Sequence, residues 1–120
     1  DEVRVCKGMK RMLEAGVNPN RMTISSDGQG SLPMYSKDGE FLGMGVGQSS
    51  CLLKEVKECV LKADIPLEIA LSTITANPAE ILRLKGKGKI EEGYDADLCI
   101  LDQDLQLVEV IARGKTVYTK

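Results

Sequence analysis

Apolar residues recur at helical spacing at the start of the chain and at alternating spacing soon after. The helical spacing predicts a helix over residues 1–16, which a glycine ends. Its apolar positions are Val3, Val5, Cys6, Met9, Met12 and Leu13. Residues 21–24 are apolar at alternate positions and β-branched at two, which predicts a buried strand. Residues 32–47 predict a hairpin that turns at an Asp-Gly pair, residues 38–39.

The middle of the chain has a helical pattern. From residue 49 onward one face is apolar and the opposite face is charged. The apolar positions are Leu52, Val56, Cys59, Val60 and Ala63. A second helix is predicted to begin at Pro66, and a third to begin with Asn77 as its N-cap. In that third helix Pro78 suits the first position, and Glu80 is placed to reach back to the cap.

The last third of the chain is β-rich. Residues 85–89 alternate lysine and glycine, which is typical of a linker or a solvated turn. A phosphate-binding loop would need a helix after it, and strands follow instead. A short strand and turn are predicted over residues 90–94, and longer strands over residues 98–101, 105–112 and 115–118.

A glycine-rich stretch follows the predicted strand at residues 21–24. It places Asp27 beside Gly28 and Gly30 and ends in Ser31. A carboxylate at the C-terminal end of a strand is how a barrel enzyme presents a catalytic side chain. The alternative is an ordinary Asp-Gly turn with its polar side chains in solvent. A second glycine run, at residues 43, 45 and 47, is either a mobile loop or a place of close backbone approach.

Composition narrows the classes of function. The 120 residues carry a net charge of −2 with acids and bases mixed, so nothing indicates a nucleic-acid or anionic membrane partner. No run is long and apolar enough to span a bilayer, and no secretory signal is seen, so we expect a cytoplasmic protein with reduced thiols. The cysteines form no C-x-x-C pair, and Cys51 and Cys59 fit a helix as small hydrophobes. Without histidine, this chain has no histidine triad, histidine zinc site or histidine base.

Three stretches together resemble one family. Residues 26–31, Ser-Asp-Gly-Gln-Gly-Ser, are similar to the end of the last barrel strand in isoaspartyl dipeptidases. Residues 75–79, Thr-Ala-Asn-Pro-Ala, and the Asp-Ala-Asp of residues 95–97 resemble the C-terminal signature of the wider amidohydrolase superfamily. Residues 108–115 resemble its closing strand. The resemblance covers essentially the whole chain, and only residues 26–31 narrow it to the dipeptidases.

The resemblance implies an α/β fold. Residues 1–84 would form the last βα portion of a metal-dependent hydrolase (β/α)₈ barrel, and residues 85–120 strands of a small β-sandwich. The implied cofactor is a pair of divalent metal ions, usually zinc, held by histidines, a carboxylated lysine and one aspartate, which Asp27 matches. The implied partners are a β-aspartyl dipeptide, the missing N-terminal part of the barrel and further copies of the protein. Because the other ligands belong to earlier strands, we expect this chain alone to bind no metal and to be inactive.

The resemblance also gives residue roles. Asp27 would act as general base and acid, Ser31 would bind a substrate carboxylate, and Gly28 and Gly30 would keep the loop slim. The alternatives are a fragment of another amidohydrolase (a deacetylase, deaminase or dihydroorotase) or a non-catalytic truncated module. Ordinary structural roles are expected for the other polar and aromatic candidates: surface positions for Arg83 and Arg113, turns for Asp95 and Asp97, and packing of the hairpin for Tyr35 and Phe41.

Overall fold

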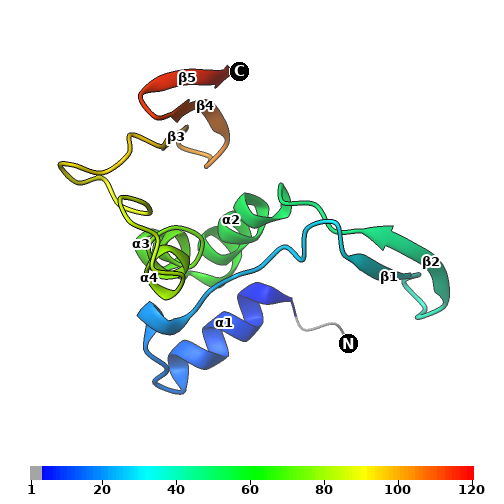
Figure 1. Ribbon diagram of the computed structural model, residues 1–120. Helices are drawn as coiled ribbons and strands as arrows, with labels where there is room; N and C mark the ends of the chain where they lie inside the picture. The colour runs from blue at the N-terminus through cyan, green and yellow to red at the C-terminus, as the bar shows by residue number, and fades with distance from the viewer. Residues whose placement is uncertain (1–3) are drawn as a thin grey trace. The chain divides into compact units, whose positions relative to one another are not determined.

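The computed structural model describes residues 4–120, which form helices and strands in two compact units (Figure 1). The first unit combines residues 4–17 with Ile24–Ala70, and the second combines Asn18–Thr23 with Leu71–Lys120. Val3, the first apolar position of the predicted N-terminal helix, lies outside the described residues. The mixed α/β content is as predicted.

The first unit is built around two helices, α1 (Val5–Glu14) and α2 (Cys51–Ala63), which pack against each other. Their buried positions are among those that the spacing predicts and supply most of the core, although Val5 and Met12 of α1 are exposed. The core residues of this unit are Cys6, Met9, Val56, Cys59, Ala63, Ile65 and Ala70. Asp64, in the left-handed conformation with φ 53°, ends α2. Helix α3 (Leu67–Ser72) then follows Pro66, as predicted.

The Cys59 thiol lies in this core with none of its surface exposed. Burial raises the pKa of the Cys59 thiol to about 11, so the thiol is protonated at neutral pH. We therefore expect a thiol-specific reagent at pH 8 to leave Cys59 unmodified in the native protein and to label the exposed Cys99. Mass spectrometry of tryptic peptides measures both sites. Equal labelling of the two cysteines without denaturant would contradict the packing of α1 on α2.

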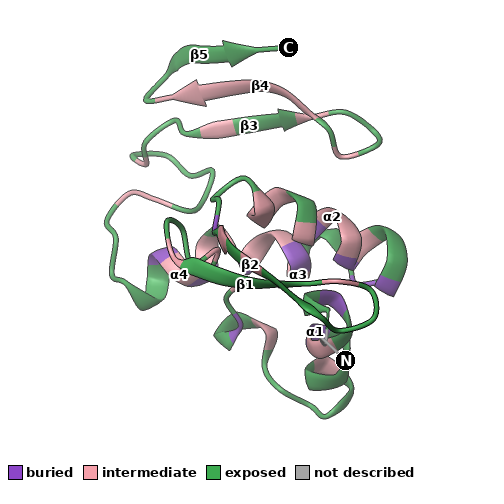
Figure 2. Cartoon of the chain, turned by 90° about the vertical axis from the view of Figure 1, so that its right-hand side faces the viewer, coloured by how far each residue is buried: buried purple, intermediate pink, exposed green. Residues whose placement is uncertain are grey.

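The predicted hairpin is confirmed. Strands β1 (Ser31–Tyr35) and β2 (Phe41–Val46) pair antiparallel, with Ser31 opposite Val46 and Tyr35 opposite Phe41. The last two side chains meet edge to face, with ring centroids 6.0 Å apart, which confirms that they pack the hairpin. In Figure 2 the hairpin is almost entirely coloured as exposed, and Leu42 keeps 63% of its surface accessible.

The second unit contains a three-stranded antiparallel sheet in the order β3 (Leu98–Leu101), β4 (Leu107–Ala112), β5 (Lys115–Thr119). The three long strands of the last third are therefore confirmed. Of the short strand and turn predicted over residues 90–94, the strand is wrong and the turn is confirmed. These residues form a turn closed by the Tyr94 amide on the Glu91 carbonyl, and Gly93 takes a φ of 85° that a paired strand does not use.

The strand predicted over residues 21–24 is not formed within residues 4–120, although the backbone at Met22 is extended, with φ −95° and ψ 134°. A short 3₁₀ helix, η1 (Pro19–Arg21), occupies its beginning, and the Asn18 side chain accepts a hydrogen bond from the Asn20 amide at its start. Alternating apolar residues indicate which side of a segment is buried, but they do not indicate what its backbone hydrogen-bonds to. Among residues 4–120 no strand pairs with this segment, and the Met22 carbonyl is bound by a side chain instead.

That side chain is Asn77, in helix α4 (Ala76–Ile81). The prediction that Asn77 caps this helix is wrong, because Thr75 holds the N-cap position. Asn77 is only 3% exposed, and its amide Nδ2 donates to the carbonyls of Pro19 and Met22, each at 2.8 Å. Asn77 thus ties two segments of the second unit that are more than fifty positions apart in the sequence.

None of the helices described between residues 4 and 120 has the length and apolarity that crossing a bilayer requires.

Candidate active site

The glycine-rich loop over residues 25–31 turns back on itself through two non-glycine residues in the left-handed region. Asp27 has φ 46° and Gln29 has φ 67°. The Gly30 amide donates to the Asp27 carbonyl at 2.8 Å, and the Asp27 amide donates to Ser25 Oγ at 3.3 Å. The loop is therefore a defined turn that leaves the Asp27 side chain exposed.

Gly30 provides the space in which the Asp27 carboxylate lies. A Cβ built on Gly30 would be 2.5 Å from Asp27 Oδ2 and 2.7 Å from Asp27 Cγ, closer than real Cβ atoms approach a neighbour. The carboxylate therefore lies directly against the Gly30 backbone. Gly28 is less constrained, since its Cβ would meet only the Ser26 hydroxyl at 3.3 Å.

Gly47 holds the same loop from the other side, and sequence reasoning did not assign it to the site. The Gln29 amide donates to the Gly47 carbonyl at 2.9 Å, and the Gly47 amide donates to the Gly30 carbonyl at 2.8 Å. Of the two alternatives left open for the second glycine run, close backbone approach is the one confirmed at Gly47. The alternating glycines at residues 43, 45 and 47 indicate a place of close approach in the sequence. They do not indicate which segment of the chain comes close.

Ser31 follows directly as the first residue of β1, opposite Val46. Its side chain is exposed, like that of Asp27. The turn thus presents a carboxylate and a hydroxyl four positions apart, with one of them fixed in a strand ladder. This arrangement can supply a proton acceptor and a separate hydrogen-bond donor.

The described residues do not by themselves make a metal centre. Among residues 4–120 no three Cys, Asp or Glu side chains gather closely enough to hold a metal ion, and the chain has no histidine. What the chain offers is the exposed Asp27 carboxylate, an oxygen donor that suits a divalent cation as one ligand of several.

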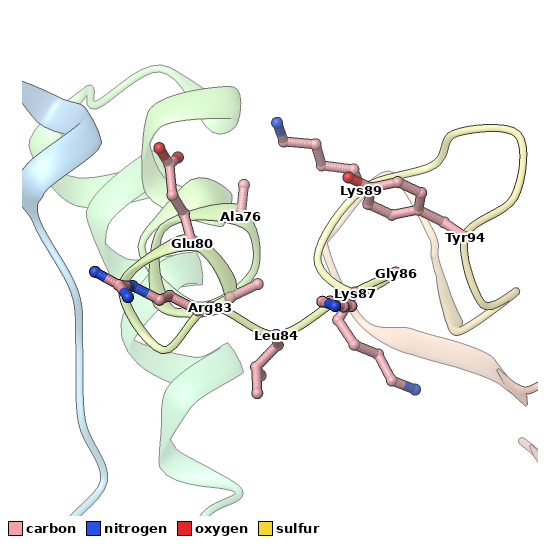
Figure 3. A pocket seen from close by; sticks show the side chains of 10 residues that line it. Ala76, Glu80, Arg83, Leu84, Gly86, Lys87, Lys89 and Tyr94 are labelled. Carbon is pink, nitrogen blue, oxygen red and sulfur yellow. The ribbon is translucent and has the colours of Figure 1, made fainter.

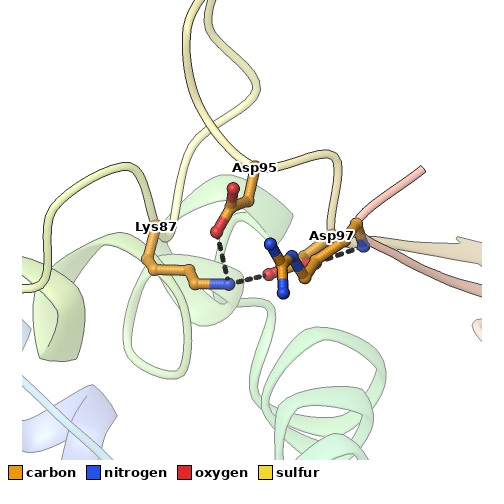
Figure 4. Close-up of polar contacts among 4 residues, drawn as sticks. Lys87, Asp95 and Asp97 are labelled. Carbon is orange, nitrogen blue, oxygen red and sulfur yellow. Dashed lines mark hydrogen bonds and ion pairs between the residues drawn. The ribbon is translucent and has the colours of Figure 1, made fainter.

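The acidic signature near the C-terminus has a structural role in this chain. Lys87 Nζ lies 2.8 Å from Asp95 Oδ2 and 2.5 Å from Asp97 Oδ2, and the Arg113 amide donates to Asp97 Oδ1 at 2.8 Å (Figure 4). The hydrogen bonds to Asp95 and Asp97 raise the pKa of Lys87. The hydrogen bonds from Lys87 and from the Arg113 amide lower the pKa of Asp97.

These contacts change the interpretation of the lysine–glycine run, residues 85–89. Lys87 is anchored by its two ion pairs, and Gly88 packs so closely on α4 that a Cβ would be 2.7 Å from the Ala79 Cβ. The run is a packed turn of the second unit and not a free linker. Asp95 and Asp97 form ion pairs with Lys87, so both have the ordinary structural role that the sequence predicts.

A hollow of about 430 Å³ lies between α4 and this turn. It is lined by Ala76, Ala79, Glu80, Arg83, Leu84, Lys85, Gly86, Lys87, Lys89 and Tyr94. Figure 3 shows the charged ends of Arg83, Lys87 and Lys89 pointing in different directions and not toward a common centre. The positive charges therefore do not converge on a ligand, and the glycine-rich loop of the first unit remains the candidate site.

Comparison with known proteins identifies the family. The amidohydrolase family model matches residues 3–117. The chain belongs to the amidohydrolase family. This amidohydrolase is 37% identical to the β-aspartyl dipeptidase of Fervidobacterium islandicum AW-1, solved in complex with a β-Asp-Leu dipeptide. The superposition has a TM-score of 0.82 and covers 99% of this chain and 30% of the dipeptidase chain.

The curated relatives of this amidohydrolase include enzymes named for other activities. The dihydroorotase of Thermoplasma acidophilum is 29% identical over 83% of this chain and 24% of its own length. The N-acetylglucosamine-6-phosphate deacetylase of Lysinibacillus sphaericus is 32% identical over 72% of this chain and 23% of its own length. The chain thus spans about a quarter of the length of these curated relatives.

Proposed function

We propose that the protein to which this chain belongs is a metal-dependent hydrolase of β-aspartyl dipeptides. The observation that carries the proposal is the 37% identity, over 99% of the chain, to a β-aspartyl dipeptidase solved with a β-Asp-Leu dipeptide. The Ser-Asp-Gly-Gln-Gly-Ser loop supports it, because the sequence there is the part that resembles the dipeptidases more than other amidohydrolases.

The proposal includes the architecture. Residues 1–84 would complete a (β/α)₈ barrel and residues 85–120 would add strands to a β-sandwich, with the rest of the barrel supplied by chain beyond these 120 residues. In that setting the exposed Asp27 would face the C-terminal opening of the barrel, where such enzymes carry their active sites. Assembly into a homo-oligomer is part of the same proposal.

Asp27 would serve as the general base and acid. A divalent metal pair, zinc being the first choice, would supply an activated water and a polarised scissile carbonyl. The Asp27 carboxylate is free to take a proton from the attacking water, since no hydrogen bond or ion pair occupies it among the described residues. The same group would then return the proton to the leaving amine.

Ser31 would bind the substrate. Its hydroxyl can donate to a carboxylate of the dipeptide, and its place in β1 fixes its backbone relative to the Asp27 turn. Gly28 and Gly30 would leave room for the substrate beside the loop. The hydrogen bond from Ser31 would favour a dipeptide as substrate, because a simple amide lacks the carboxylate that accepts it.

A second candidate function is dihydroorotase or N-acetylglucosamine-6-phosphate deacetylase activity. Its support is the curated relatives, which are 29% and 32% identical over most of this chain. All three activities hydrolyse a C–N bond, so the same Asp27 role would apply, and only the contacts with the rest of the substrate would differ.

The test is a comparison of substrates on the complete protein with its metal content verified. We expect release of free leucine from β-Asp-Leu with a kcat/KM at least ~10²-fold above that for either alternative substrate, because a site built to pair with the polar groups of one substrate rejects compounds that do not place such groups there. α-Asp-Leu is the matched control for the β-linkage. Turnover of dihydroorotate or the acetylated sugar phosphate, with β-Asp-Leu untouched, would overturn the proposal.

A further inference from the structure

We propose that Gly47 is the positioning residue of this site, holding Asp27 where it can transfer a proton. The inference rests on the proposed role of Asp27 and adds a residue twenty positions away in the sequence. Gly47 lies just after β2 and is buried, although both ends of the loop that it contacts are exposed. Its contacts with that loop are all made by backbone atoms.

Two hydrogen bonds fix the loop on Gly47. The Gly47 carbonyl accepts from the Gln29 amide at 2.9 Å, and the Gly47 amide donates to the Gly30 carbonyl at 2.8 Å. These bonds extend the β1–β2 ladder by one residue beyond the Ser31–Val46 pair. Gln29 and Gly30 lie two and three residues after Asp27, so the turn that contains the carboxylate is held at its C-terminal side.

Only glycine allows this approach. A Cβ on Gly47 would overlap the Asp27 carbonyl oxygen and lie 3.0 Å from the Ser26 carbonyl oxygen. Both are backbone atoms, so neither can rotate away as a flexible side-chain tip can. An added methyl must therefore push the Asp27 turn outward, and Asp27 holds a left-handed φ of 46° that depends on its surroundings.

The test compares Gly47→Ala with Gly45→Ala in the complete, metal-loaded protein. Gly45 is two residues earlier, within β2, and a Cβ there meets first the flexible Met34 Sδ, at 3.0 Å. We expect Gly47→Ala to lower kcat by roughly 10²-fold, since a displacement of about 1 Å suffices for that loss. KM should change little because Ser31 stays in the ladder, and Gly45→Ala should keep near-normal kcat.

A double-mutant cycle separates positioning from general damage to the fold. If Gly47 acts through Asp27, Gly47→Ala should cost nothing further in kcat once Asp27→Asn is present. A purely structural defect would lower kcat by the same factor in both backgrounds, and that result would overturn the proposal. Failure of Asp27→Asn itself to affect kcat would instead refute the proposed role of Asp27.

Hydrogen exchange gives a readout that needs no activity, and its first measurement needs only the unmutated protein. In the unmutated protein the amides of Gln29 and Gly47 should exchange slowly, and that of the neighbouring Gly28 fast, because only the first two donate across the ladder. In Gly47→Ala the Gln29 amide should lose its protection, whereas in Gly45→Ala it should keep it. Fast exchange at Gln29 and Gly47 in the unmutated protein would overturn the inference.

Discussion

Replacing Asp27 by Asn in the complete protein should lower kcat for β-Asp-Leu by ~10²–10⁴-fold, the usual contribution of a positioned acid–base side chain. Asn keeps the size of the side chain and tolerates the left-handed φ of 46°, so the turn should be preserved. It cannot accept a proton at neutral pH. The measurement is steady-state kinetics, with metal content determined on the same sample because the carboxylate is also proposed as a metal ligand.

Ser31→Ala is the matched comparison on the same loop. It removes a hydrogen bond to a substrate carboxylate, worth about 1.5–3 kcal/mol when one partner is charged, so KM should rise more than kcat falls. Near-normal kcat for Asp27→Asn at full metal occupancy would show that the loop is only a structural turn. Equal kcat losses in both variants would indicate a damaged loop and not two separate roles.

The elements that the sequence predicts correctly are those in which local chemistry and packing agree. The β1–β2 hairpin has an Asp-Gly turn, and Gly39 takes the φ of 87° that such turns use. Helix α2 has an apolar face of the right period, which packs on α1. Residues 21–24 form no strand ladder within residues 4–120, because alternation identifies a buried face and does not supply a pairing strand. The Met22 carbonyl accepts from the Asn77 side chain instead.

The candidate site is visible in the sequence only in part. Asp27, Gly28, Gly30 and Ser31 stand together, and their residue types suffice to suggest a carboxylate on a tight turn. Gly47 could not be assigned, because its role depends on which backbone atoms a distant glycine meets after the hairpin closes. The roles of the four loop residues in catalysis stay predictions until the variants are measured.

Asn77 shows why a strong local signal can mislead. Asn followed by Pro and, three positions after the Asn, by Glu is typical of a helix start, but α4 begins one residue earlier, at Ala76, with Thr75 as its N-cap. The side chain nevertheless turns to two carbonyls of the Asn18–Thr23 segment, which local rules cannot foresee. A neutral amide suits this place because its NH₂ group has one donor for each of the two carbonyls at 2.8 Å, with Ser72 Oγ farther away at 3.5 Å.

Asn77→Ala in the complete protein should lower the free energy of unfolding by about 1–3 kcal/mol, the cost of leaving a buried carbonyl without its donor. Met22, whose carbonyl is one acceptor, is buried, so water cannot readily replace the amide. Urea denaturation measures the loss as a lower midpoint at unchanged slope.

Two further variants make the Asn77 result specific. Asn77→Asp keeps the shape but directs carboxylate oxygens at the two carbonyls, so it should destabilise more than alanine does. Asn18→Ala removes an exposed capping bond from the Asn20 amide in the same segment and should cost about 0.5–1 kcal/mol, the lower part of the range for lost caps. If Asn77→Ala were as mild as Asn18→Ala, the amide would not be what holds the Asn18–Thr23 segment on α4.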